Sequence, residues 1–281
     1  MRPARIIFLY AVAVVVLGAL LAPGFYWLVH PDKPQWLFRR VFDRSLLIVA
    51  VVGLWPMLRK LEIRSWRELG YGFRPAWWRE ALSGFVLGVG SFAVGGALLL
   101  ALGVRSITGW DGSVFKFLLT GIVVGILEET LFRGGIFGAL RRGFPLWPAI
   151  LLAGAIYSAV HFLKPKGTQI DIVTWLSGFD QLGQVFRNSF QADGVAISFV
   201  TLLLAGVILA VAFVRTRTLY LSVGLHAGWV FALKSFAAMT DATGPRQWWG
   251  GGTLVDNLLV WPVLLVVWWV ISKWPTQSSN G

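Results

Sequence analysis

The chain has 281 residues, 57% of them hydrophobic and 14% charged, and a formal net charge of +12. Its mean hydropathy of +0.71 excludes an ordinary soluble globular protein and predicts a polytopic membrane protein. The basic residues are spread over short loops, which argues against a nucleic-acid partner and favours membrane lipid, and the absence of cysteine excludes disulfides, thiolate metal sites and a cysteine nucleophile.

Eight apolar segments are candidates for membrane spans, since a span needs about 20 apolar residues. In chain order they cover residues 5–28, 44–58, 80–103, 115–139, 145–163, 194–214, 217–239 and 254–272. We therefore predict an all-α polytopic membrane protein with about eight transmembrane helices and a single membrane domain over residues 1–281. The first segment resembles a signal peptide, but its apolar run continues past Pro23, so we interpret it as a retained span. The second segment is short and contains Pro56.

The linkers indicate how the chain sits in a membrane. The longest, 164–193, ends in an amphipathic stretch from Trp175 to Phe190 that is typical of an interfacial helix or a lid. His30 follows the first span and is interpreted as an interfacial loop residue. Lys and Arg outside the spans are slightly more numerous on the side of the N-terminus, which favours cytoplasmic termini. The short loops and arginine-rich character favour the inner (plasma) membrane of a bacterium.

Small residues recur at four-residue spacing, a pattern that lets membrane helices approach closely. The pairs are Gly84/Gly88, Gly121/Gly125, Gly134/Gly138 and Gly224/Gly228. Most such pairs reflect ordinary packing. However, Gly121, Gly125 and Glu128 share one face of the fourth segment, so we expect Glu128 to point into the helix bundle.

Two adjacent glutamates, Glu128 and Glu129, lie inside this fourth segment, where one acid at the bilayer centre costs about 2.5–3.5 kcal/mol. Such residues must face protein or water, so the pair marks a functional site. Glu129 and Arg133 have the i, i+4 spacing of a helical ion pair, which leaves Glu129 either a structural or a catalytic role. Glu128 points about 100° away around the helix and can accept a proton from water, as a general base does.

His161 and His226 also lie within apolar segments. Each histidine alone is compatible with a simple hydrogen-bonding contact between helices. Together with the two glutamates they favour one intramembrane polar site. There a carboxylate and one imidazole would activate a water for hydrolysis, and the second imidazole would donate to an oxyanion.

Three motifs follow one another in this region: Glu128-Glu-Thr-Leu-Phe-Arg133, Tyr157-x-x-x-His161 and His226-Ala-Gly-Trp-Val230. They resemble the Glu-Glu-x-x-x-Arg, aromatic-x-x-x-His and His-x-x-x-Asn motifs of the CPBP intramembrane proteases, also called the type II CAAX prenyl endopeptidase or Abi family. Order and spacing agree over residues 117–235, inside a core motif region that we place at 115–239.

The resemblance implies a glutamate-dependent intramembrane endopeptidase that hydrolyses a peptide bond of a membrane-associated peptide or protein. In that family the first glutamate and the first histidine activate the water, which assigns Glu128 and His161 this role and makes His226 an oxyanion donor. Glu129 is included among the catalytic residues, with Arg133 in support.

The resemblance leaves three points to settle. Tyr157 stands at the aromatic position as a further supporting residue. We expect no metal and no cofactor, although Glu128, His161 and His226 would also form a His₂Glu set of the kind that binds catalytic zinc. Val230 stands where the family has asparagine and offers no side-chain donor. Ser222 and Trp229 are candidates to replace that donor.

Two non-enzymatic functions stay open. The chain lacks the His-Glu-x-x-His and Gly-x-Gly-Asp motifs of other intramembrane proteases. Val230 keeps open a non-catalytic immunity or binding protein on the same fold. The buried acids and histidines are also compatible with a proton-coupled carrier, but no internal repeat is visible.

Overall fold

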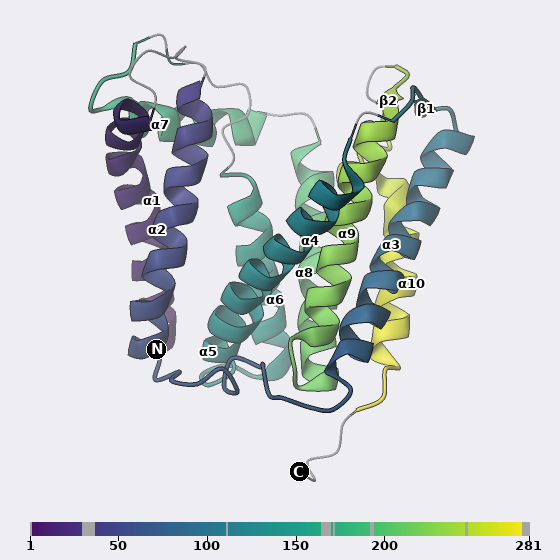
Figure 1. Cartoon of the computed structure of the whole chain (residues 1–281), viewed down its shortest axis with the longest axis horizontal. Helices are drawn as coiled ribbons and strands as arrows, with labels where there is room; N and C mark the ends of the chain where they lie inside the picture. The colour runs from purple at the N-terminus through teal and green to yellow at the C-terminus, as the bar shows by residue number, and fades with distance from the viewer. Residues whose placement is uncertain are drawn as a thin grey trace. The chain divides into compact units, whose positions relative to one another are not determined.

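The computed structural model describes residues 2–29, 37–110, 112–163, 170, 172–191, 194–244 and 247–276, and His30 and 164–169 lie outside them. The described chain is almost entirely helical and forms two compact units (Figure 1). The first unit comprises Met1–Arg64 and Ala159–Val195, and the second comprises Ser65–Ser158 and Ala196–Gly281.

The first unit is built from α1 (Arg2–Val29), α2 (Phe38–Lys60) and α7 (Ser177–Gln191). The Ser45 hydroxyl donates to the Gly18 carbonyl at 2.7 Å, so α1 and α2 pack closely along their length. Apolar side chains from all three helices form the core of this unit: Ala19, Ala22, Tyr26, Phe38, Phe42 and Val185.

The predicted amphipathic stretch is helical, since it forms α7. Gly178 lies against the carbonyl of Ala19, where a larger residue would clash with the α1 backbone. Just before α7, the Trp175 ring packs edge-on against Trp27 with 4.5 Å between centroids. A role of α7 as an interfacial helix or a lid stays a prediction.

The second unit contains the predicted motif region. Its elements are α3 (Trp77–Ala101), β1 (Arg105–Ile107), α4 (Val114–Glu129), a π-helix η2 (Thr130–Phe137), α5 (Gly138–Leu140), α6 (Leu146–His161), α8 (Val195–Thr216), α9 (Tyr220–Met239), β2 (Thr240–Ala242), η3 (Leu258–Val260) and α10 (Trp261–Ser272). The last three residues of α6 and the first of α8 fall in the first unit. Helix α9 runs between α3 and α4 (Figure 1).

A small antiparallel sheet was not foreseen in the all-α prediction. Strand β1 pairs with β2 so that Arg105 lies opposite Ala242 and Ile107 lies opposite Thr240. The sheet joins the chain just after α3 to the chain just after α9, and it holds the C-terminal ends of these two helices together.

Five described helices are long and apolar enough to cross a membrane: Pro3–Val29, Phe38–Lys60, Trp77–Ala101, Val195–Thr216 and Tyr220–Met239. Two shorter apolar helices cover Leu146–His161 and Leu258–Ser272. The protein is therefore an integral, polytopic helical membrane protein, while the number of eight spans stays a prediction. The second segment was expected to be short, but it forms a helix of 23 residues that passes through Pro56.

Candidate active site

Glycines bring two helices against α9 and thereby place the site. A Cβ atom on Gly88 of α3 would lie 2.5 Å from the Leu225 carbonyl oxygen of α9. On the other side, a Cβ on Gly121 of α4 would lie 2.6 Å from the Ala227 carbonyl oxygen. The close helix approach predicted for these glycines is confirmed. His226 lies between these two contact positions, so its backbone is fixed by both neighbouring helices.

The second pair in the motif region behaves differently. Gly134 lies in η2, and a Cβ there would meet the Leu69 carbonyl oxygen at 2.8 Å, whereas Gly138 has more room. The partner is thus the loop before α3 rather than another helix. Only glycine lets this loop reach the π-helix that follows the glutamates.

Glu129 is the fully buried carboxylate of the pair, with none of its side chain exposed, whereas 30% of the Glu128 side chain is exposed. Glu128 also points toward α9 as expected, because its Oε2 is buried and lies 3.7 Å from Nε2 of His226, but Glu129 is the more deeply buried of the two. The reason is helical spacing: Glu129 follows Gly125 by four residues and continues the stripe of Gly121 and Gly125 that faces α9.

The buried Glu129 contacts Arg133 and His226. Its Oε1 accepts a hydrogen bond from Arg133 Nη1 at 2.9 Å, which confirms the predicted i, i+4 ion pair. The same oxygen lies 2.8 Å from Nδ1 of His226 on α9. Arg133 is only 2% exposed, and its Nη2 donates to the Gly206 carbonyl of α8 at 3.1 Å. The pair is thus held to both α8 and α9.

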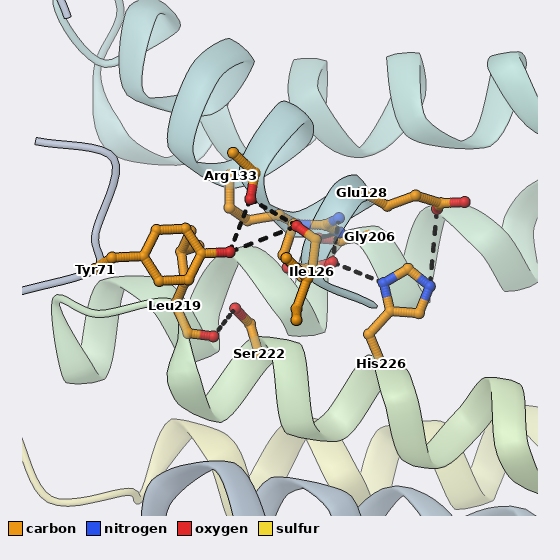
Figure 2. A network of polar contacts seen from close by, with 10 residues as sticks. Tyr71, Ile126, Glu128, Arg133, Gly206, Leu219, Ser222 and His226 are labelled. Carbon is orange, nitrogen blue, oxygen red and sulfur yellow. Dashed lines mark hydrogen bonds and ion pairs between the residues drawn. The ribbon is translucent and has the colours of Figure 1, made fainter. Parts of the chain in front are cut away.

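His226 bridges the two glutamates. While Nδ1 contacts Glu129, its Nε2 lies 3.7 Å from Oε2 of Glu128 (Figure 2). The imidazole is 4% exposed, so its orientation is set by these contacts. The sequence brought both glutamates and His226 to one site but did not reveal that Glu129 would be the residue that orients the histidine.

Tyr157 of α6 lies beside this cluster, while its supporting role stays a prediction. Its ring is edge-on to His226 with 6.0 Å between centroids, and the Arg133 guanidinium lies 4.7 Å from its centre. Phe132 packs edge-on against the same ring at 5.1 Å. These aromatic faces enclose the ion pair and keep water from Arg133.

The helix changes type directly after Glu129. In η2 the Gly138 N–H donates to the Arg133 carbonyl, five residues earlier. Wide turns of this kind are rare and occur frequently at functional sites. Because the π-helix starts at Thr130, it lies between the glutamates and Arg133 and sets the direction of the Arg133 side chain relative to theirs.

Tyr71 was missed by the sequence analysis. It lies in the loop before α3, and its hydroxyl is 2.7 Å from Thr130 Oγ1, which in turn donates to the Ile126 carbonyl at 2.6 Å (Figure 2). Burial raises the pKa of the Tyr71 phenol above its ordinary value, and nearby Glu129 adds to this. The neutral phenol therefore braces the start of the π-helix. The one signal in the sequence was its position between Gly70 and Gly72, which is typical of a tight loop.

The two candidates proposed to replace the missing asparagine are engaged elsewhere. The Ser222 hydroxyl donates to the Leu219 carbonyl at 3.0 Å, and the Trp229 indole N–H donates to Ser91 of α3 at 3.0 Å. Both hydrogen bonds hold α9 in its packing. The suggestion that either side chain serves as an oxyanion donor is therefore wrong for this arrangement. Val230 is half-buried and follows His226 by one turn.

His161 is the last residue of α6, is half-buried and falls in the first unit. Its pairing with Glu128 stays a prediction. Among the described residues, no three His, Asp or Glu side chains gather in a way that would hold a metal ion.

The structure therefore brings the buried Glu129, Arg133 and His226 and the partly exposed Glu128 together within an integral membrane protein. Residues 109–232 match the family model described as type II CAAX prenyl endopeptidase Rce1-like. The match includes all three motifs and confirms their resemblance to the CPBP or CAAX protease family. No curated protein and no solved structure matched the chain.

Proposed function

We propose that the protein is an intramembrane endopeptidase that uses a Glu/His-activated water. The observation that carries the proposal is the contact of His226 with both glutamates, through Nδ1 to Glu129 and through Nε2 toward Glu128. A carboxylate and an oriented imidazole in a partly dry site are the groups that general acid–base hydrolysis requires.

Glu128 is the general base in this proposal. The 30% exposure of its side chain supports the assignment, because an attacking water must reach the carboxylate, although the Oε2 atom that faces His226 is buried. Glu129 has no exposed side chain. Glu128 takes a proton from the water, the water oxygen bonds to the scissile carbonyl carbon, and the proton passes to the amine as the C–N bond breaks. His161 assists in holding the water. This role is the one that the family motif gives to the histidine four residues after the aromatic position, here Tyr157.

Glu129 orients His226 and Arg133 anchors Glu129. The imidazole of His226 lies between the two carboxylates, with Nδ1 on Glu129 and Nε2 toward Glu128. When Nε2 carries a proton, it is a hydrogen-bond donor. It would then stabilise the oxyanion that forms on the scissile carbonyl.

Val230 limits the expected rate. One oxyanion-hole donor is worth about 2.7–4 kcal/mol in other hydrolases, and valine supplies none at this position. With Ser222 and Trp229 engaged in packing, His226 carries the oxyanion with fewer partners than the family motif provides. The same observation favours a second candidate, a non-catalytic binding or immunity protein on this fold.

The remaining features concern the membrane setting. We propose eight spans, since each predicted segment contains a described helix. The substrate is a peptide or protein with a membrane-associated segment, and no nucleic acid, cofactor or metal takes part. The short loops and arginine-rich character support localisation in a bacterial inner membrane, and the slight excess of Lys and Arg on the side of the N-terminus supports cytoplasmic termini.

Substrate trapping tests the proposal. Glu128→Gln keeps the size of the side chain but removes the base, so a crosslinker placed near the site should capture membrane peptides that wild-type protein releases as fragments. Glu62→Gln, an exposed glutamate outside the site, is the matched control and should release the same fragments as wild type. Capture of an intact partner that wild-type protein also leaves uncut would instead support the binding protein.

A further inference from the structure

One end of the second unit carries a concentration of basic side chains, here called the basic end. Six are exposed and two are half-buried: Arg67, Arg79, Arg141, Arg142, Arg217 and Lys273, then Arg74 and Arg215. Among the described residues of this unit, the acidic side chains at this end are Glu68 and Glu80. The basic end therefore has a large positive excess.

These residues belong to four separate loops that lie together. The loop before α3 contacts the α8–α9 junction, because the Leu219 N–H donates to the Gly70 carbonyl at 2.9 Å. The end of α10 contacts the same junction, because Arg215 Nε donates to the Trp274 carbonyl at 2.9 Å. The end of the α4–α5 segment reaches the loop before α3 through Gly134. The charges thus form one surface across four helix ends.

The opposite end of the unit shows no comparable excess among its described residues. It holds Arg105, Lys116 and Lys234 against Asp241 and Asp256. Arg105 Nε donates to Thr240 Oγ1 at 2.7 Å, and at the basic end Arg74, Arg141 and Arg215 likewise donate to backbone carbonyls. The two ends of this unit therefore differ in charge. The difference is larger than the slight excess of Lys and Arg that the whole sequence shows on the side of the N-terminus.

The basic end borders exposed apolar helix surface. On α3, Arg79 lies 5.3 Å from the ring centre of Trp78, and Leu82, 53% exposed, follows within one turn. On α10, Lys273 follows Trp269, which is 59% exposed. Tryptophan and arginine beside an outward apolar surface are typical of the membrane–water interface. This position favours lipid headgroups over a soluble acidic protein as the partner.

We propose that the basic end binds the anionic phospholipid headgroups of one leaflet and thereby sets both the orientation and the depth of the catalytic site. Anionic lipids attract clustered Lys and Arg side chains near the membrane surface. Loops rich in Lys and Arg lie preferentially on the cytoplasmic side of a membrane. The basic end of the second unit consequently lies on the cytoplasmic side of the membrane.

The geometry of α9 then gives the depth of the site. His226 lies six residues from the start of α9 and thirteen from its end, or about 9 Å and about 20 Å at 1.5 Å per residue. The cluster of His226 with the two glutamates is therefore nearer the basic end. This part rests on the proposed function: a substrate would reach the site from the anionic cytoplasmic leaflet.

Orientation is testable without any catalysis, because the chain has no cysteine. Gly143 at the basic end and Gly244 at the opposite end have no atoms near a would-be Cβ, so cysteine fits at both. With a membrane-impermeant maleimide, Gly143→Cys should label only in inside-out vesicles, and Gly244→Cys only in intact spheroplasts. The reverse pattern would overturn the orientation.

Lipid binding is tested by the phosphatidylglycerol that the purified protein retains from vesicles of mixed phosphatidylglycerol and phosphatidylcholine. Replacing Arg141, Arg142 and Lys273 by glutamine should lower the retained phosphatidylglycerol several-fold, whereas Arg141→Lys with Arg142→Lys should keep it, because charge and not shape is recognised. Lys116→Gln with Lys234→Gln, at the opposite end, is the matched control and should leave it unchanged.

Equal retention by the glutamine variant and the wild type would overturn lipid binding, as would equal loss in the control. Selective capture of an acidic peptide in place of phosphatidylglycerol would overturn it as well. None of these measurements depends on proteolysis. A chain that orients and binds lipid as expected but cleaves nothing would leave this inference intact and refute only the proposed function.

Discussion

Adjacent residues with the same side chain occupy different environments in this site. Glu129 is buried and holds Arg133 and His226, while Glu128 is partly exposed and faces the other nitrogen of the imidazole. The difference follows from one residue of helical phase relative to Gly125. The two glutamates should therefore respond differently to the same substitution.

Glu129→Ala should destabilise the protein strongly. It leaves Arg133 buried without its carboxylate, and breaking a buried ion pair typically costs about 3–5 kcal/mol. The thermal unfolding midpoint in detergent and the amount of protein accumulated in membranes should both fall. Glu128→Ala, at the partly exposed position, should lower the unfolding midpoint and the accumulated amount of protein by much less. Equal loss in the two variants would contradict the assigned roles.

Val230→Asn should maintain or raise the rate of hydrolysis, because it supplies the donor that the family motif contains. If the new amide reaches the oxyanion, kcat should rise by up to about 10²–10³-fold, the usual effect of one such donor. Val230→Ala is the control for lost volume and should bring no gain. A large loss of kcat with Val230→Asn would indicate that the oxyanion lies elsewhere.

Helix α9 supplies His226 to the site, and glycines of α3 and α4 pack directly against its backbone. Alanine-sized side chains on Gly88 or Gly121 would collide with α9 backbone, so the site depends on contacts made without side chains. The four-residue glycine spacing predicted the approach correctly for these positions. It could not tell which helices would meet, because spacing alone names no partner.

Gly88→Ala should lower the unfolding midpoint and the activity together. Its Cβ would press on the Leu225 carbonyl, next to His226, and overpacking of this kind costs about 1–3 kcal/mol. Gly90→Ala is the matched control on the same helix, where nothing lies within 4 Å, and it should be neutral or slightly stabilising. The prediction fails if both variants behave alike.

Other parts of the elements could not be predicted from sequence. The eight apolar segments all contain helices because hydrophobic length is a local property of the chain. The π-helix after Glu129 and the Tyr71–Thr130 hydrogen bond depend on contacts with a loop about sixty residues earlier, which no periodicity records. For the same reason the sequence identified Glu128, Glu129 and His226 but did not reveal that Glu129 would be the more deeply buried glutamate or that it would contact His226.

At the scale of the whole molecule, charge and hydropathy act together. Apolar helices place the chain in a membrane, and within the second unit the basic end marks one side. The family match covers residues 109–232, so the sequence patterns of the helices outside this region come from the chain itself. Their sequences predicted spans but carried no sign of a particular substrate.

Chelation should leave activity unchanged. The proposed mechanism uses only Glu128, the two histidines and water, so EDTA or 1,10-phenanthroline in the assay should not alter the rate. Restoration of a lost rate by added zinc would assign Glu128, His161 and His226 as metal ligands instead. Glu62→Gln protein treated in the same way controls for general effects of the chelator on the membrane.

The most direct measurement is the rate of peptide-bond hydrolysis by purified protein reconstituted in vesicles, with a substrate obtained by trapping. Glu128→Gln should lower this rate by about 10²–10⁴-fold, the usual contribution of a general base, while its unfolding midpoint stays close to that of the wild type. Glu62→Gln should hydrolyse the substrate as the wild type does. Hydrolysis at the wild-type rate by folded Glu128→Gln protein would contradict the account.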